Sequence, residues 1–87
     1  MKTYLVECYL PRTRSSEIAD VASRLTASGA GGSAAETARY LRSTYVPDDE
    51  ICFHVFEAES IVAVREASLR VALVFDRIVE SEEQGAG

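Results

Sequence analysis

The segment from Ile51 to Ala58 constrains the fold most, because apolar residues occupy both alternating sets of its positions. It reads ICFHVFEA and holds two of the three phenylalanines, the only histidine and one of the two cysteines. A strand with one solvated face alternates apolar and polar residues, whereas a strand that is apolar on both sides is expected to be covered on both sides. In a chain of 87 residues, the second cover can come from another subunit.

The length and composition are those of one soluble globular domain. The net charge of −5 argues against nucleic acid and against anionic membrane surfaces, because such partners require basic residues. No run of about 18 apolar residues is present, so no membrane span is expected, and the start lacks the pattern of a signal peptide. Two cysteines are too few for a disulfide scaffold, which favours a reduced, cytoplasmic protein.

The other elements follow from apolar periodicity and turn residues. An apolar stripe at i, i+3, i+4 and i+7 predicts a first helix, which Ser15 or Ser16 caps and which ends before Gly29; the stripe consists of Ile18, Val21, Ala22 and Leu25. Small residues from Gly29 to Ala35 predict a connector rather than a phosphate-binding loop. Ser60 is expected to cap a second helix over residues 60–72. Strands are predicted at residues 2–10, 38–46, 51–58 and 76–81.

The resulting order β-α-β-β-α-β predicts an α+β, ferredoxin-like sandwich, in which two helices cover one face of a four-stranded antiparallel sheet. In this fold the first and third strands are central, and these are the two strands that are apolar on both sides. The arginines at 39 and 42 favour an edge position for the second strand. We expect one domain over residues 1–82 and a frayed acidic tail over residues 83–87.

The two sets of alternating residues predict which side chains face the helices. The set assigned to the helix side is the more purely apolar one, namely Tyr4, Val6, Cys8, Phe53 and Val55. The other face would carry Leu5, Glu7, Tyr9, Cys52, His54 and Phe56. Such an apolar patch is expected to be an interface, so we predict a homodimer that closes sheet to sheet into an α+β barrel. Cys8 and Cys52 would then lie on opposite faces, which argues against a disulfide between them.

His54 is the first candidate for a functional residue, because a neutral imidazole is the commonest protein ligand of transition metals. In the predicted arrangement it shares a face with Cys52 and Glu7. Nitrogen, sulfur and carboxylate donors together predict a site for nickel, copper or zinc. The alternative is an interface histidine that is hydrogen-bonded to Glu7 or a tyrosine, with an arginine such as Arg42 neutralising the carboxylate.

A second hypothesis is a small-molecule-binding or cofactor-independent, oxygenase-like barrel. It predicts an apolar pocket of about 300 Å³ or more, lined by Tyr9, Tyr45 and Phe56 near His54. Packing within the sheet is the alternative role for the tyrosines. No nucleophile–base–orienter set and no cofactor motif is evident, so an enzyme is not indicated and no catalytic residue is assigned. A third hypothesis is a dimer that recruits another protein.

Several short motifs resemble a family of small bacterial domains of unassigned function, one branch of which is called nickel-binding protein. They are Phe53-His54-Val55-Phe56-Glu57-Ala58, Val64-Arg65-Glu66-Ala67, Asp76-Arg77-Ile78-Val79-Glu80, Tyr4-Leu5-Val6-Glu7 and Tyr40-Leu41-Arg42-Ser43. The resemblance covers nearly the whole chain. It implies a ferredoxin-like fold, a dimeric α+β barrel and, for the named branch, nickel coordination.

This chain departs from the family pattern at three places. His54 stands where the family has a cysteine, Ser68 where many members have a histidine, and Ala72-Leu73-Val74 where they have Gly-x-Pro. The first exchange keeps a metal ligand and the second removes one. The resemblance therefore implies a possible metal site without specifying nickel.

Overall fold

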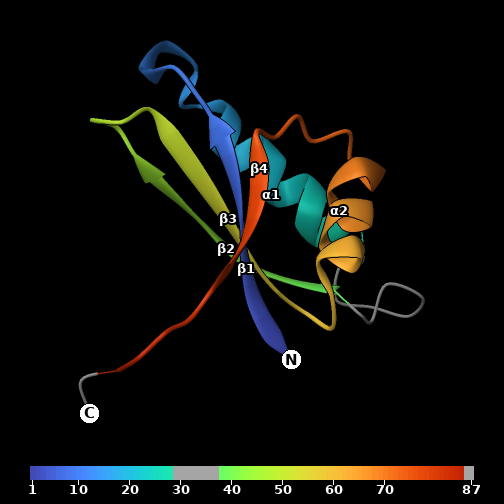
Figure 1. Cartoon of the computed structure of the whole chain (residues 1–87). Coiled ribbons are helices and arrows are strands. Elements are labelled where there is room, and N and C mark those ends of the chain that lie inside the picture. The colour runs from blue at the N-terminus through green and yellow to red at the C-terminus, as the bar shows by residue number, and fades with distance from the viewer. Residues whose placement is uncertain (29–37, 86–87) are drawn as a thin grey trace.

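The structure is a computed structural model that describes residues 1–28 and 38–85 (Figure 1). The strands are β1 (Lys2–Tyr9), β2 (Ala38–Val46), β3 (Ile51–Ala58) and β4 (Arg77–Ser81); the helices are η1 (Arg12–Arg14, a 3-10 turn), α1 (Glu17–Ala27) and α2 (Ile61–Arg70). Every predicted strand and helix is present, with boundaries that differ by one or two residues at some ends. The predicted connector at residues 29–35 lies outside the described residues.

The four strands form one antiparallel sheet in the order β2-β3-β1-β4, and both helices pack against the same face (Figure 1). This arrangement confirms the ferredoxin-like α+β fold, the central positions of β1 and β3 and the edge position of β2. In the described part of the chain, no helix has the length and hydropathy needed to cross a membrane.

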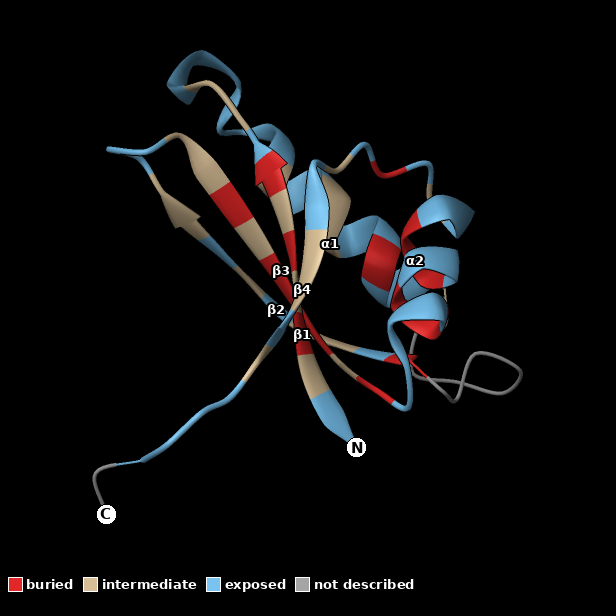
Figure 2. Ribbon diagram, in the orientation of Figure 1, coloured by how far each residue is buried: buried red, intermediate tan, exposed pale blue. Residues whose placement is uncertain are grey.

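The hydrophobic core lies between the sheet and the two helices. Figure 2 shows the buried positions along β1 and β3 and on the side of each helix that faces the sheet. The largest fully buried side chains are Phe56, Leu25, Val6, Val64, Cys52 and Ser68. Val6 and Phe56 come from the two central strands, Leu25 comes from α1 and Val64 from α2, so the sheet and both helices contribute to the core.

The strand register corrects the predicted faces of β3. Tyr4, Val6 and Cys8 of β1 face the helices as predicted, but their partners across the ladder are Phe56, His54 and Cys52. Directly opposed residues project to the same side of a sheet, so these three residues of β3 also face the helices. Phe53 and Val55, which were predicted to face the helices, lie on the open face instead. The prediction ranked the two sets by apolarity, but every member of the set that carries the histidine and the cysteine is buried, whereas only Val55 is buried in the other set.

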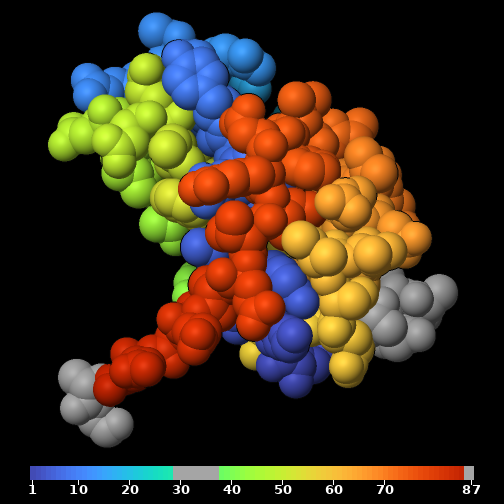
Figure 3. Space-filling model, in the orientation of Figure 1, coloured from blue at the N-terminus to red at the C-terminus, as the bar shows by residue number. Residues whose placement is uncertain are grey.

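The described part of the acidic tail, up to Gly85, has no regular secondary structure. It extends from the end of β4 away from the body of the molecule (Figure 3), on the side of the sheet opposite the helices (Figure 1). Glu83 nevertheless lies 3.5 Å from the guanidinium of Arg42 on β2. Residues that follow β4 thus reach across to the opposite edge strand of the sheet.

Candidate functional site

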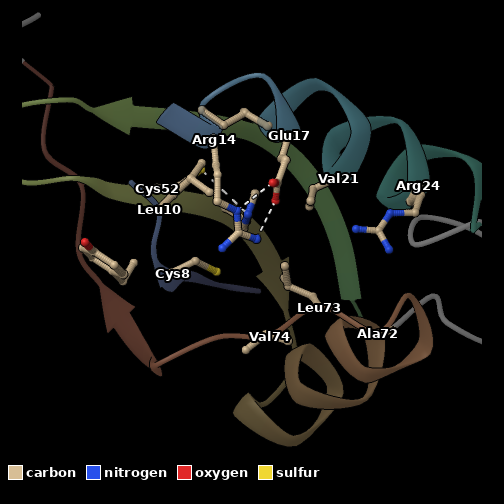
Figure 4. Close-up of a pocket in the computed structure, with 13 residues that line it drawn as sticks. Cys8, Leu10, Arg14, Glu17, Val21, Arg24, Cys52, Ala72, Leu73 and Val74 are labelled. Atoms are coloured by element: carbon tan, nitrogen blue, oxygen red, sulfur yellow. Dashed lines mark hydrogen bonds and ion pairs between the residues drawn. The ribbon is translucent and has the colours of Figure 1, made fainter. Parts of the chain in front are cut away.

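A cavity of about 430 Å³ lies between the helix-facing side of the sheet, the first half of α1 and the segment that follows α2 (Figure 4). Its volume is within the range of about 300–1,000 Å³ that is typical of small-molecule sites. Most of the residues that line it are apolar, but polar and apolar atoms contribute equally to its surface, and the charged residues among them are two arginines and a glutamate. The lining residues are Cys8, Tyr9, Leu10, Arg14, Glu17, Ile18, Val21, Arg24, Cys52, His54, Ala72, Leu73 and Val74.

Three polarisable side chains of the central strands form the floor of the cavity. Cys52 and His54 are two residues apart on β3, and Cys8 is the direct partner of Cys52 on β1. The Sγ atom of Cys52 lies 3.8 Å from Nε2 of His54, which is a sulfur–nitrogen hydrogen-bond distance. The alternation of side chains along a strand therefore brings two thiols and one imidazole to the same cavity.

The other nitrogen of His54 is fixed by the neighbouring edge strand. Nδ1 lies 2.7 Å from Oγ of Ser43, and this hydroxyl lies 2.6 Å from the hydroxyl of Tyr40. Ser43 is the partner of His54 in the β2–β3 ladder, so the register of the hairpin positions this contact. A thiol, an imidazole and two hydroxyls thus form a continuous hydrogen-bonded row from the cavity to β2.

Burial controls the protonation of the groups on the cavity floor. His54 is only 2% exposed, and burial lowers its pKa to about 4, so the imidazole is neutral at pH 7. Burial also raises the pKa of the Cys52 thiol, and it raises that of Cys8 to about 12, with a smaller contribution from Cys52. At neutral pH the side chains on the cavity floor are therefore uncharged, so the floor favours an apolar ligand over an ion.

An ion pair stands at the side of the cavity formed by α1. The guanidinium of Arg14 donates to both carboxylate oxygens of Glu17, at 2.7 and 2.9 Å (Figure 4). These hydrogen bonds lower the pKa of Glu17. Arg24, in the second half of α1, donates to the backbone oxygen of Val71 at 3.0 Å and so connects α1 to the end of α2.

The structure divides the predicted metal-binding residues between the two faces of the sheet. It brings His54 and Cys52 together but places Glu7 on the open face, opposite Phe53. There the carboxylate of Glu7 accepts a hydrogen bond from Nε of Arg77 at 3.0 Å. Glu7 is thus paired with an arginine, but the partner is Arg77 rather than Arg42, which lies 3.5 Å from Glu83.

Of the residues predicted to line a pocket, Tyr9 alone lines this cavity, and it does so from an exposed position at the end of β1. Phe56 is fully buried and packs edge-on against Tyr40, with their ring centroids 5.6 Å apart. The hydroxyl of Tyr45 donates to the backbone oxygen of Leu10 at 2.7 Å. Tyr45 therefore supports the cavity wall without lining it.

Sequence reasoning missed the wall of the cavity that comes from α1 and from the segment after α2. Ile18 and Val21 belong to the predicted apolar stripe of α1, so the sequence predicted that they face the sheet. It did not predict the cavity beside them. The spacing of Arg14 and Glu17, at i and i+3, was an available signal of the ion pair. Cys8 was excluded from the site only because β3 was assigned to the wrong face.

The donor atoms on the floor suit a soft metal only in part. Among residues 1–28 and 38–85, no group of three or more histidine, cysteine, aspartate or glutamate side chains is arranged to hold a metal ion. The closest approach to such a group is the pair of Cys52 and His54, with Cys8 across the ladder. Thiolate and imidazole are ligands that zinc, copper and nickel accept, so the chemistry of the pair fits although the number of ligands is low.

No family model matches the chain, and no curated protein sequence is significantly similar to it. Among solved structures, the chain is similar to the crystal structure of SCO4226 from Streptomyces coelicolor A3(2). The TM-score is 0.73, the sequence identity is 13%, and the alignment covers 95% of this chain and 99% of that chain. At this identity the likeness supports the fold and says nothing about the cavity.

Proposed function

We propose that this protein binds a small, mainly apolar organic molecule in the cavity between α1 and the sheet. The observation that carries the proposal is a cavity of about 430 Å³ whose floor is formed by the Cys52–His54 pair. Apolar walls with a few converging polar groups are the usual composition of a ligand site. The sulfur and nitrogen atoms on the floor provide weak, uncharged contacts for orientation, and the walls provide the apolar area.

The binding of 1-anilinonaphthalene-8-sulfonate tests this proposal, because its fluorescence rises in apolar surroundings. We expect the native protein to bind the dye and Val21→Phe to lose most of the binding, because the larger ring occupies the cavity. The matched control is Phe53→Lys, which changes the open face and should leave binding intact. Equal binding by Val21→Phe and the native protein, with loss in Phe53→Lys, would contradict the proposal.

A transition-metal site is the second candidate function, and the distance between Cys52 Sγ and His54 Nε2 favours it. Two such ligands of one tetrahedral zinc ion, with bonds of about 2.3 and 2.05 Å, would be about 3.6 Å apart. The observed separation of 3.8 Å is close to that value. Cys8 is the third donor in reach across the ladder, and it replaces Glu7 in the ligand set predicted from sequence.

Calorimetric titration of the reduced protein with Ni²⁺, Cu²⁺ and Zn²⁺ tests the metal site. We expect saturable binding that His54→Ala and Cys52→Ala both weaken, with Glu7→Gln as a control that does not. Because the thiols are protonated at neutral pH, binding should release protons into the buffer. Unchanged affinity in His54→Ala would exclude this site.

Homodimerisation through the open face of the sheet remains part of the proposal. Leu5, Ile51, Phe53 and Val79 are partly exposed there, and no helix covers them in the described structure. Such a patch is typical of an interface. Two sheets facing each other would form the α+β barrel predicted from sequence.

A cytoplasmic location is also proposed, because both cysteines are free thiols.

A further inference from the structure

Cys8 and Cys52 are direct partners across the ladder that joins β1 and β3. Both thiols are free, both face the helices and both line the cavity (Figure 4). Their exposed fractions are 7% for Cys8 and 1% for Cys52, so a reagent reaches them through the cavity rather than from bulk solvent. The chain thus places its only two cysteines side by side, 44 positions apart in sequence.

The ladder sets the distance between these two residues. Two positions further along, the backbone N–H of Leu10 donates to the oxygen of Glu50 at 2.7 Å. Hydrogen-bonded and non-hydrogen-bonded pairs alternate in an antiparallel ladder, so Cys8 and Cys52 form a hydrogen-bonded pair, with Cα atoms about 5.5 Å apart. Disulfides span Cα distances of about 4.4–6.8 Å. A bond between the two sulfurs therefore requires little movement of the backbone.

The surroundings of the two sulfurs differ. Sγ of Cys52 contacts Nε2 of His54, and the hydroxyl of Ser43 contacts the other ring nitrogen and so orients the imidazole. For Cys8 no hydrogen bond of the thiol is found among the described residues, and burial raises the pKa of both thiols. The contact with His54 therefore distinguishes Cys52, which we assign as the thiol that reacts first, with Cys8 following.

We propose that Cys8 and Cys52 are a redox-active dithiol that a hydroperoxide converts into a cross-strand disulfide. The sulfur of Cys52 attacks one oxygen of hydrogen peroxide while the proton of the thiol passes to the other oxygen. The O–O bond breaks, leaving a sulfenic acid on Cys52 and releasing one water. The sulfur of Cys8 then loses its proton, attacks the sulfur of Cys52 and displaces the hydroxyl group as a second water. Two thiols are oxidised by two electrons, and one peroxide is reduced to two waters.

This reaction goes beyond the binding function and does not depend on it, since neither an organic ligand nor a metal takes part. A small oxidant fits the site because both sulfurs are nearly inaccessible to bulk solvent. The disulfide would cross the floor of the cavity, beside His54. A cytoplasmic thiol reductant would restore the dithiol, as expected for a transient intracellular disulfide.

Peptide mapping of the native protein tests the proposal without any substitution. Reduced protein is treated with hydrogen peroxide, blocked with iodoacetamide and digested with trypsin without reduction. Cleavage after the basic residues yields Cys8 in the peptide 3–12 and Cys52 in the peptide 43–65. We expect mass spectrometry to find these two peptides linked within a monomeric chain, and dithiothreitol to separate them. Two unreacted thiols, or peptides linked only between chains, would overturn the proposal.

Two variants test the order of the steps. In Cys8→Ala the reaction should stop at the sulfenic acid, which dimedone traps on residue 52. In Cys52→Ala, dimedone labelling of Cys8 should be several-fold lower than that of Cys52 in the first variant. Equal labelling of the two cysteines would overturn the assignment of Cys52 as the attacking thiol. Circular dichroism of both variants confirms that they are folded before oxidation.

Discussion

The surroundings of His54 hold it in its neutral form. The imidazole is buried between Cys52 and Ser43, and no carboxylate contacts it among the described residues. Burial without an anionic partner penalises the charged form, which is why its pKa falls to about 4. A neutral imidazole is required for metal coordination. The same feature makes the stability of the protein sensitive to acid.

Acidification is expected to destabilise the protein through His54. The folded-state pKa of about 4 lies below the ordinary value of 6.5, so the unfolded chain takes up the proton first. The stability contributed by the neutral form is therefore present above about pH 6.5 and is lost as the pH falls toward 4. Linkage gives a loss of about 3 kcal/mol over this range. Urea unfolding at a series of pH values measures it.

The control for this prediction is His54→Gln, which keeps hydrogen-bonding atoms but does not titrate. The carboxylates titrate equally in both proteins, so the difference between the two pH profiles isolates the histidine. Parallel profiles would show that His54 is not protonated more easily in the unfolded chain. Since the chain has one histidine, its imidazole NMR signal also gives the folded-state pKa directly.

At this scale the sequence indicated His54 and Cys52 correctly as neighbours, because residues two apart on a strand share a face. It wrongly placed this pair on the same face as Glu7, because the relative facing of two strands depends on register, which a single sequence does not determine. Arg14 and Val21 could not be connected to His54, since they come from a helix whose approach to the sheet is set by tertiary packing.

The two helices begin with a serine in each case, but only one serine caps its helix with a side chain. Oγ of Ser60 accepts a hydrogen bond from the backbone N–H of Ala63 at 3.3 Å. Ser16 precedes α1 with a helical backbone conformation and makes no such bond. The extended conformation of Ser60 is what allows its hydroxyl to reach back over the first turn.

Ser60→Ala is therefore expected to lower the free energy of unfolding by about 1 kcal/mol, since it leaves a backbone N–H of α2 without its acceptor. Ser16→Ala is the matched control and should have an effect of less than about 0.5 kcal/mol. Urea denaturation of the two variants and the native protein measures the difference. Equal losses would show that the Ser60 contact does not contribute.

The end of α2 uses an alanine where a glycine is the usual residue. The N–H of Ala72 donates to the oxygen of Leu69, and the N–H of Leu73 donates to that of Ser68, both at 3.0 Å. These two bonds define a Schellman motif, whose key residue adopts a left-handed conformation. Ala72 does so with a φ of 56°. Its Cβ atom is strained there, and glycine would avoid the strain.

We accordingly expect Ala72→Gly to stabilise the protein by about 1 kcal/mol. Ala19→Gly in α1 is the contrasting control, because Ala19 has helical geometry and its replacement should cost up to about 1 kcal/mol. Thermal unfolding of both variants tests the sign of each effect. A lower Tm for Ala72→Gly would mean that the left-handed conformation is not maintained in solution.

At the scale of elements, the sequence predicted the order and type of every strand and of both α-helices that the structure describes, but not the 3-10 turn η1. The patterns that allowed this are local, such as the turn at Pro47 and the apolar stripe of α1. The faces of β3 were not predictable in the same way, because both of its sets are apolar. The set that carries Cys52 and His54 is the one that faces the helices, and Ser43 of the adjacent strand provides a hydrogen-bond partner for the buried His54.

For the whole molecule, the two faces of the sheet have different roles in this account. The helix-covered face holds the cavity, and the open face carries the partly exposed apolar residues. Phe53 lies near the middle of the open face, between Thr44 and Glu7 on the neighbouring strands. The proposed dimer would bury it, as a strand that is apolar on both sides requires.

Phe53→Lys should therefore convert a dimer into a monomer, because the interface would have to bury an unpaired charge. Light scattering after size-exclusion chromatography reports the mass in solution. The matched control is Val62→Lys, which changes an exposed apolar residue of α2 and should leave the mass unchanged. A native protein that is monomeric at all accessible concentrations would refute the proposed barrel.

The central claim is that the ligand site lies in the cavity above the Cys52–His54 pair rather than on the open face. NMR spectroscopy of the ¹⁵N-labelled protein, titrated with 1-anilinonaphthalene-8-sulfonate, tests it most directly, since each backbone amide reports its own surroundings. The account predicts saturable shifts that centre on Cys8, Leu10, Val21, His54 and Leu73. Shifts that centre instead on Leu5, Phe53 and Val79, with the cavity residues unchanged, would contradict it.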